Sequence, residues 1–132
     1  MNIGLIAQDS KKKLMQNFCI AYRSILAKHK LFATGSTGRL IEEATGLSIH
    51  KYLEGDLGGA EQFATQISEN GMDLVIFFKD SSSVKESMFD PKKVLLLCDK
   101  YSVPLATNLA TAELLIKSLD YGDLEWREVY HS

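Results

Sequence analysis

The stretch Ala33-Thr34-Gly35-Ser36-Thr37-Gly38-Arg39-Leu40 decides the fold, because it joins an apolar run to a helical pattern. The apolar run, residues 31–33, is typical of the end of a strand, and residues 40–44 are typical of a helix. A helix N-terminus leaves backbone N–H groups unpaired and carries a partial positive charge, and glycine lets an anion approach the backbone closely. Residues 34–38, called the cradle below, are therefore predicted to bind phosphate. The alternative is purely local: Ser36 or Thr37 caps the helix and the glycines turn the chain.

Composition limits the classes of protein to which the chain can belong. It has 132 residues, 45% of them hydrophobic, and a formal net charge of −2. These values predict a single globular domain over residues 1–132 and give little support to nucleic acid as a partner. No apolar run is long enough to span a membrane, and no basic leader with a cleavage site is visible, so we expect no membrane contact and no signal peptide.

Cysteine and histidine usage points to the cytoplasm and away from metal. Cys19 and Cys98 lie far apart inside helical patterns, which is typical of buried free thiols in a cytosolic protein. The histidines are scattered and no CxxC or HExxH spacing occurs, so no metal site is predicted.

Strand patterns and helix patterns alternate along the chain. Strands are predicted at residues 2–7, 31–33, 48–53, 74–78 and 103–107. Helices are predicted at residues 11–28 and 40–44, after the glycine-rich residues 54–62, from residue 90 and at residues 108–117. Near the C-terminus, alternation of aromatic and charged side chains predicts one more strand at 125–130.

This alternation predicts an α/β fold, a three-layer, Rossmann-like sandwich with a mainly parallel central sheet and helices on both faces. In such sheets, ligands bind at the carboxyl ends of the strands. The cradle and Asp80 follow strands, and Lys12 opens a helix, so we expect them to converge on one edge of the sheet.

An ordered set of short pieces covering nearly the whole chain resembles the methylglyoxal synthase family. The pieces are residues 6–9, 33–38, 44–47, 58–59, 73–80 and 103–112, together with Lys12. The resemblance implies a cytosolic homohexamer that acts on dihydroxyacetone phosphate without a cofactor. The family removes a proton from carbon, forms an enediolate and expels phosphate. The same fold is used by IMP cyclohydrolase and by regulatory domains of carbamoyl phosphate synthetase. The resemblance is therefore also compatible with ligand binding without lyase chemistry.

Carried over position by position, the resemblance assigns contacts with a phosphorylated ligand to Lys12, Thr34, Gly35, Ser36, Thr37 and Gly55. Glu54 stands where the family has a serine, and a carboxylate there repels phosphate unless it turns away or pairs with Lys12 or Arg39. Arg127 matches an arginine that reaches the phosphate site of a neighbouring subunit, with a surface arginine as the alternative.

The chemical half of the pattern departs from the family. Ala60 stands at the catalytic aspartate, and a methyl group accepts no proton. Gln8 replaces a histidine; it can hydrogen-bond a ligand oxygen but cannot shuttle a proton near neutral pH. In residues 81–92, Phe89 and Lys92 stand where the family has a second histidine and an acid.

Two readings follow. The leading one is a non-catalytic family member that holds a phosphorylated small molecule, with a nucleotide-like molecule as one option, for sequestration or sensing. The alternative is an active methylglyoxal synthase with a displaced base: Asp9 and Asp80 remain from the family site, Asp56 could fold over it, and Glu61 points about 100° away from Ala60 on a helix. A third, weaker reading is a regulatory subunit that contacts another protein through its surface.

Overall fold

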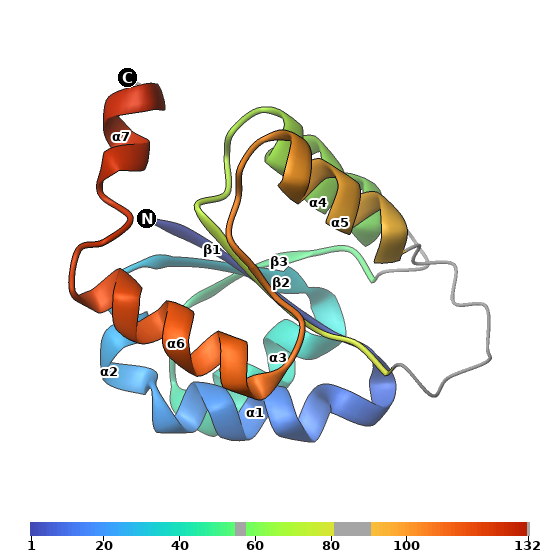
Figure 1. Ribbon diagram of the computed structural model, residues 1–132. Coiled ribbons are helices and arrows are strands. Elements are labelled where there is room, and N and C mark those ends of the chain that lie inside the picture. The colour runs from blue at the N-terminus through green and yellow to red at the C-terminus, as the bar shows by residue number, and fades with distance from the viewer. Residues whose placement is uncertain (55–57, 81–90, 132) are drawn as a thin grey trace.

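The computed structural model describes residues 1–54, 58–80 and 91–131 and shows a sheet between two layers of helices (Figure 1). Of the residues singled out in the sequence, Gly55, Asp56 and Phe89 lie outside these ranges.

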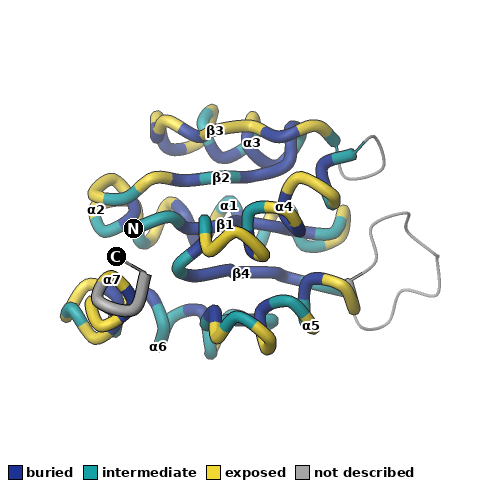
Figure 2. The backbone as a smooth tube through the Cα atoms, turned by 90° about the horizontal axis from the view of Figure 1, so that it is seen from above, coloured by how far each residue is buried: buried dark blue, intermediate teal, exposed yellow. Residues whose placement is uncertain are grey.

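Within the described ranges, five parallel strands form one sheet in the order β3-β2-β1-β4-β5. The strands are β1 (Asn2–Ala7), β2 (Lys30–Thr34), β3 (Ile49–Tyr52), β4 (Leu74–Phe78) and β5 (Leu105–Ala106). Figure 2 looks down on the sheet and shows β3, β2, β1 and β4 side by side in this order. The predicted α/β class with a parallel central sheet is confirmed.

Helices cover both faces of the sheet. The helices are η1 (Asp9–Lys11, a 3-10 turn), α1 (Lys12–Ala21), α2 (Arg23–Leu26), α3 (Gly35–Thr45), α4 (Gly59–Ser68), α5 (Pro91–Lys100), α6 (Leu109–Asp120) and α7 (Trp126–His131). α1, α3 and α6 lie on one face, and α4 and α5 lie on the other (Figure 1). None of the helices in the described ranges is long and apolar enough to cross a lipid bilayer.

The core is divided by the sheet into two clusters, because alternate residues of a strand point to opposite faces. In β4, Ile76 packs toward α1, α3 and α6, whereas Val75 and Phe77 pack toward α4 and α5. Strands covered on both faces must be apolar throughout, which explains the continuous run Leu74–Phe78.

Each cluster buries one free thiol, as predicted. Cys19 belongs to the first cluster and Cys98 to the second. Burial raises the pKa of each thiol to about 12.

Two predictions of secondary structure were wrong. Where a strand was predicted at residues 125–130, the chain forms helix α7 from Trp126 to His131, and Leu124 and Arg127, three positions apart, are both buried while Trp126 stays 45% exposed. The long helix predicted from residue 11 to 28 is broken at Tyr22, whose backbone is not helical (φ −109°, ψ 24°).

Candidate functional site

The order of the strands reverses direction between β1 and β4. From β1 the chain proceeds outward through β2 to β3, and from β4 it proceeds in the other direction to β5. In open parallel sheets, ligands bind outside the carboxyl ends of the strands where the order reverses. Here those ends lead directly into Gln8 after β1 and into Lys79 and Asp80 after β4.

Gln8 and Asp80 are bound to each other across this switch point. The Gln8 backbone N–H donates to the Phe78 carbonyl at 3.1 Å, and the Asp80 backbone N–H donates to Gln8 Oε1 at 2.5 Å. The Ser10 hydroxyl donates to Asp80 Oδ2 at 2.7 Å. The Asp80 carboxylate is therefore held in a defined orientation at the carboxyl edge of the sheet.

Helix α3 begins at the cradle, as expected from the glycine and hydroxyl pattern. It starts at Gly35, and Thr34 is the N-cap residue with an extended backbone (φ −68°, ψ 158°). Ser36 and Thr37 therefore lie inside the helix, and neither is the cap that the local alternative required. The Thr34 side chain itself makes no capping hydrogen bond. The first N–H groups of a helix need outside acceptors, and the positive end of the dipole favours an anion.

Lys12 contacts both the cradle and the turn that follows β1. Its Nζ donates to Ser36 Oγ at 2.8 Å and lies 3.0 Å from Asp9 Oδ1. The Lys12 side chain is 24% exposed, whereas that of Asp9 is 98% exposed. Lys12 is thus positioned beside the start of α3, where it was predicted to contact phosphate.

The Glu54 carboxylate contacts the cradle at Ser36. Arg39 Nη2 donates to Glu54 Oε1 at 2.8 Å, which is one of the two pairings expected for this carboxylate. A Cβ on Gly35 would lie only 2.8 Å from the same oxygen, so glycine is what allows this approach. Burial alone would raise the pKa of Glu54, but hydrogen bonds from the Ser36 hydroxyl, from Arg39 and from the Ser36 backbone N–H lower it below its ordinary value.

The Thr37 hydroxyl is a buried polar group without a partner among the described residues. The residue is 1% exposed and lies in the first turn of α3. An unpaired buried hydroxyl in a native structure calls for a specific explanation, and a ligand is one.

The start of α4 brings Ala60 to the position that the resemblance gives to the base. Gly58 has a φ of +113°, and a Cβ on Gly59 would lie 2.2 Å from the Leu53 carbonyl oxygen, so both glycines are needed for this turn. Ala60 packs against the second core cluster. Glu61 is 72% exposed and lies 2.8 Å from Lys93 Nζ on α5, so it faces α5 and not the cradle.

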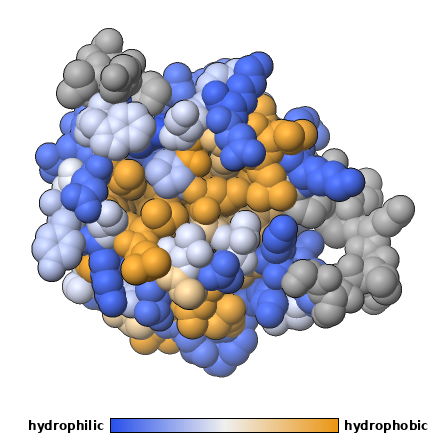
Figure 3. All heavy atoms as spheres, in the orientation of Figure 1, coloured by the Kyte–Doolittle hydropathy of each residue, from blue (hydrophilic) through white to orange (hydrophobic). Residues whose placement is uncertain are grey.

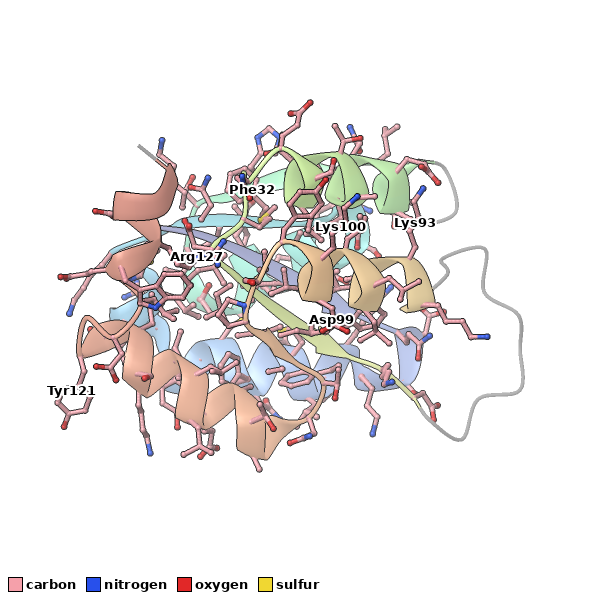
Figure 4. The ribbon with its side chains drawn as sticks, turned by 45° about the horizontal axis from the view of Figure 1, so that its top comes forward. Phe32, Lys93, Asp99, Lys100, Tyr121 and Arg127 are labelled. Atoms are coloured by element: carbon pink, nitrogen blue, oxygen red, sulfur yellow. The ribbon has the colours of Figure 1, made fainter. Side chains whose placement is uncertain are left out.

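Arg127 lies apart from the other predicted ligand residues. Its side chain is fully buried beneath α7, near the amino end of β4 (Figure 4), whereas the cradle lies at the carboxyl ends of the strands. The guanidinium donates to the carbonyls of Ser102 and Met72 (3.3 Å for Met72) and lies 3.5 Å from Asp73 Oδ1. Its predicted contact with a neighbouring subunit's ligand stays a prediction.

Two features were missed in the sequence. Ser10 orients Asp80 from 70 positions away, and Ser36 links Lys12 to Glu54 in one hydrogen-bonded series. The turn-forming residues 8–10 after the first strand were the available signal for Ser10. In the part of the chain that the structure describes, no group of three or more His, Cys, Asp or Glu side chains is arranged to hold a metal ion.

Comparison with known proteins gives consistent matches. Residues 15–107 match the family model of the MGS-like domain. A methylglyoxal synthase of Caldicellulosiruptor saccharolyticus is 57% identical over 129 residues, which cover 98% of this chain and 92% of the relative. One from Listeria welshimeri is 51% identical, with coverage of 98% and 96%. The crystal structure of methylglyoxal synthase from Elizabethkingia anophelis is 36% identical, with a TM-score of 0.83 over 87% of this chain and 76% of that one.

Proposed function

Because the chain belongs to the methylglyoxal synthase family, we propose that it converts dihydroxyacetone phosphate to methylglyoxal and phosphate. The observation that carries the proposal is the match to relatives of that name over 98% of the chain at 57% identity. These relatives support the active reading over the non-catalytic one that led the sequence analysis.

The cradle supplies the phosphate anchor of the proposed reaction. In the proposed complex, the backbone N–H groups at the start of α3, the hydroxyls of Ser36 and Thr37, and the Lys12 ammonium are the groups that can donate hydrogen bonds to the phosphate. Holding the phosphate there fixes the rest of the triose at the switch point between β1 and β4.

The base must be a carboxylate other than the one that the resemblance places at position 60. Asp80 fits this role better than Asp9, because Ser10 orients its carboxylate, whereas Asp9 is 98% exposed and paired with Lys12. Asp80 takes the proton from the triose carbon, and the C–H electron pair forms the enediolate. The C–O bond to phosphate then breaks with its electrons leaving on phosphate, and the resulting enol takes up a proton at carbon to give methylglyoxal. Gln8 holds the Asp80 backbone in place.

A turnover assay with dihydroxyacetone phosphate tests the proposal. We expect methylglyoxal above background with the wild-type chain, and a fall in kcat of roughly 100- to 10,000-fold in Asp80→Asn. Asp99→Asn is the matched control, since Asp99 is an exposed carboxylate on α5, away from the switch point (Figure 4). If the Asp80→Asn variant keeps the turnover of the wild-type chain, Asp80 is not the base, and Asp9 or Asp56 takes that role instead.

One specific observation keeps the non-catalytic reading as a second candidate. The position that the resemblance gives to the base holds a methyl group, Ala60, which packs on the core, and the Gln8 amide is engaged with Asp80. This reading predicts no turnover by the wild-type chain and a gain in Ala60→Asp combined with Gln8→His. Mass spectrometry of small molecules released from the denatured protein would then identify the ligand.

The finer predictions of the sequence belong to the same proposal. They are a cytoplasmic location, a homohexamer and a reaction without cofactor. Contacts of the phosphorylated ligand with Thr34, Gly35 and Gly55 also stay a prediction.

A further inference from the structure

The cradle already holds an anion that belongs to the chain. The Glu54 carboxylate accepts a hydrogen bond from Arg39 at 2.8 Å, is hydrogen-bonded by Ser36, and lies so close to Gly35 that a Cβ there would be 2.8 Å from its oxygen. These are the contacts that the start of a helix offers to a phosphate oxygen.

The charges around the cradle are balanced. Lys12 lies 3.0 Å from Asp9, and Arg39 lies 2.8 Å from Glu54, so each cation has its own carboxylate. An arriving phosphate therefore finds no free positive charge in these two pairs. Like charges that share one site repel each other strongly, so the phosphate and the Glu54 carboxylate exclude one another there.

The Glu54 carboxylate is also able to leave. Its side chain is 33% exposed and that of Arg39 is 59% exposed. Ion pairs with this much solvent access contribute little to stability, so releasing the pair toward water costs little. Once Glu54 has left, Arg39 offers the incoming ligand a cation.

We propose that Glu54 is a resident anion that occupies the start of α3 in the free protein, and that a phosphate ester binds by displacing it. This inference rests on the proposed function, which makes the cradle the phosphate site. The displacement makes the site selective for doubly charged phosphate esters over singly charged carboxylates, because a carboxylate offers nothing that Glu54 does not already supply.

Titration of the full chain with inorganic phosphate, with acetate as the carboxylate probe, tests this inference. In Glu54→Gln we expect the Kd for phosphate to fall roughly tenfold or more relative to wild type, and acetate to bind measurably. Glu42→Gln is the matched control. Like Glu54, Glu42 is a carboxylate paired with a cation, here Lys51 at 2.7 Å, but it lies within α3, away from the start of that helix. We expect its Kd to stay within about twofold of wild type.

An NMR signal gives a second readout. In the wild-type chain, phosphate should shift the guanidinium resonances of Arg39, because the Glu54 partner of its Nη2 is displaced. A Kd in Glu54→Gln equal to or above that of wild type, or an Arg39 signal that phosphate leaves unchanged, overturns the inference. Lys12→Met separates the two claims: phosphate affinity that survives it contradicts the proposed phosphate site itself, whatever Glu54 does.

Discussion

At the scale of single residues, two threonines of helix α3 differ in how their buried hydroxyls are satisfied. The Thr45 hydroxyl donates to the Ile41 carbonyl at 2.6 Å and accepts from the Leu47 backbone N–H at 3.1 Å. The Thr37 hydroxyl is buried without a partner in the described ranges. A buried hydroxyl that lacks a partner destabilises the folded state, so its retention indicates a use other than stability.

Replacing Thr37 by valine should separate stability from binding. Valine keeps the shape and removes the hydroxyl, so we expect Thr37→Val to raise the free energy of unfolding by about 1 kcal/mol. If the hydroxyl donates to a bound phosphate, the same variant should raise the Kd for phosphate roughly tenfold. Urea unfolding and phosphate titration measure the two effects.

Thr45→Val is the control on the same helix. It removes both hydrogen bonds and leaves the Leu47 N–H unpaired, so we expect a loss of about 2 kcal/mol with an unchanged Kd. A Thr37→Val variant that is less stable than wild type would mean that the Thr37 hydroxyl has a structural partner, and the argument for a ligand contact would fall.

At the scale of elements, the Arg127 side chain connects helix α7 to the sheet. Arg127 is fully buried and bonds the carbonyls of Met72 and Ser102, which precede β4 and β5. The sequence could not indicate this, because the guanidinium's partners lie 25 to 55 positions away. Aromatic and charged residues that alternate over six positions therefore looked like a strand, although the buried positions follow helical spacing.

Arg127→Met tests whether this arginine is structural. Methionine fills much of the volume but leaves Asp73 Oδ1 and two carbonyls without the guanidinium donor, so we expect a loss of about 3 kcal/mol in the free energy of unfolding. The KM of the folded enzyme for dihydroxyacetone phosphate should not change. A variant as stable as wild type with a raised KM would instead support the predicted contact with a neighbouring subunit's ligand.

At the scale of the whole molecule, local patterns predicted the parallel sheet with helices on both faces, but not the order of its strands. Alternating strands and helices predict a parallel sheet, and the rule of carboxyl ends then brings Lys12, the cradle and Asp80 together. The details depend on contacts between distant segments: Ser10 meets Asp80 across 70 positions, and Glu54 meets Arg39 across 15. Which of two cations Glu54 pairs with is decided by where β3 ends relative to α3, which no local pattern contains.

Apolar side chains gather across the middle of one face of the molecule (Figure 3). The edge strand β5 is flanked by α5 and α6, which carry Leu96 and Leu114 with exposed fractions of 68% and 71%. Tyr121 and Trp126, which follow α6, are also exposed, at 86% and 45%. Extended apolar surface of this kind marks contact with another protein chain, and it supports the predicted homo-oligomer.

Light scattering on the purified chain tests the oligomer. We expect a mass that is a multiple of the 14.7 kDa protomer at micromolar concentration. Leu114→Glu and Leu114→Lys should both shift the mass toward the protomer, because each places a charge in apolar surface that we expect the oligomer to bury. Dissociation by one sign of charge alone would indicate an electrostatic contact instead. A wild-type chain that stays at the protomer mass at every concentration would contradict the oligomer, and a ligand contact by Arg127 across subunits would have to be abandoned with it.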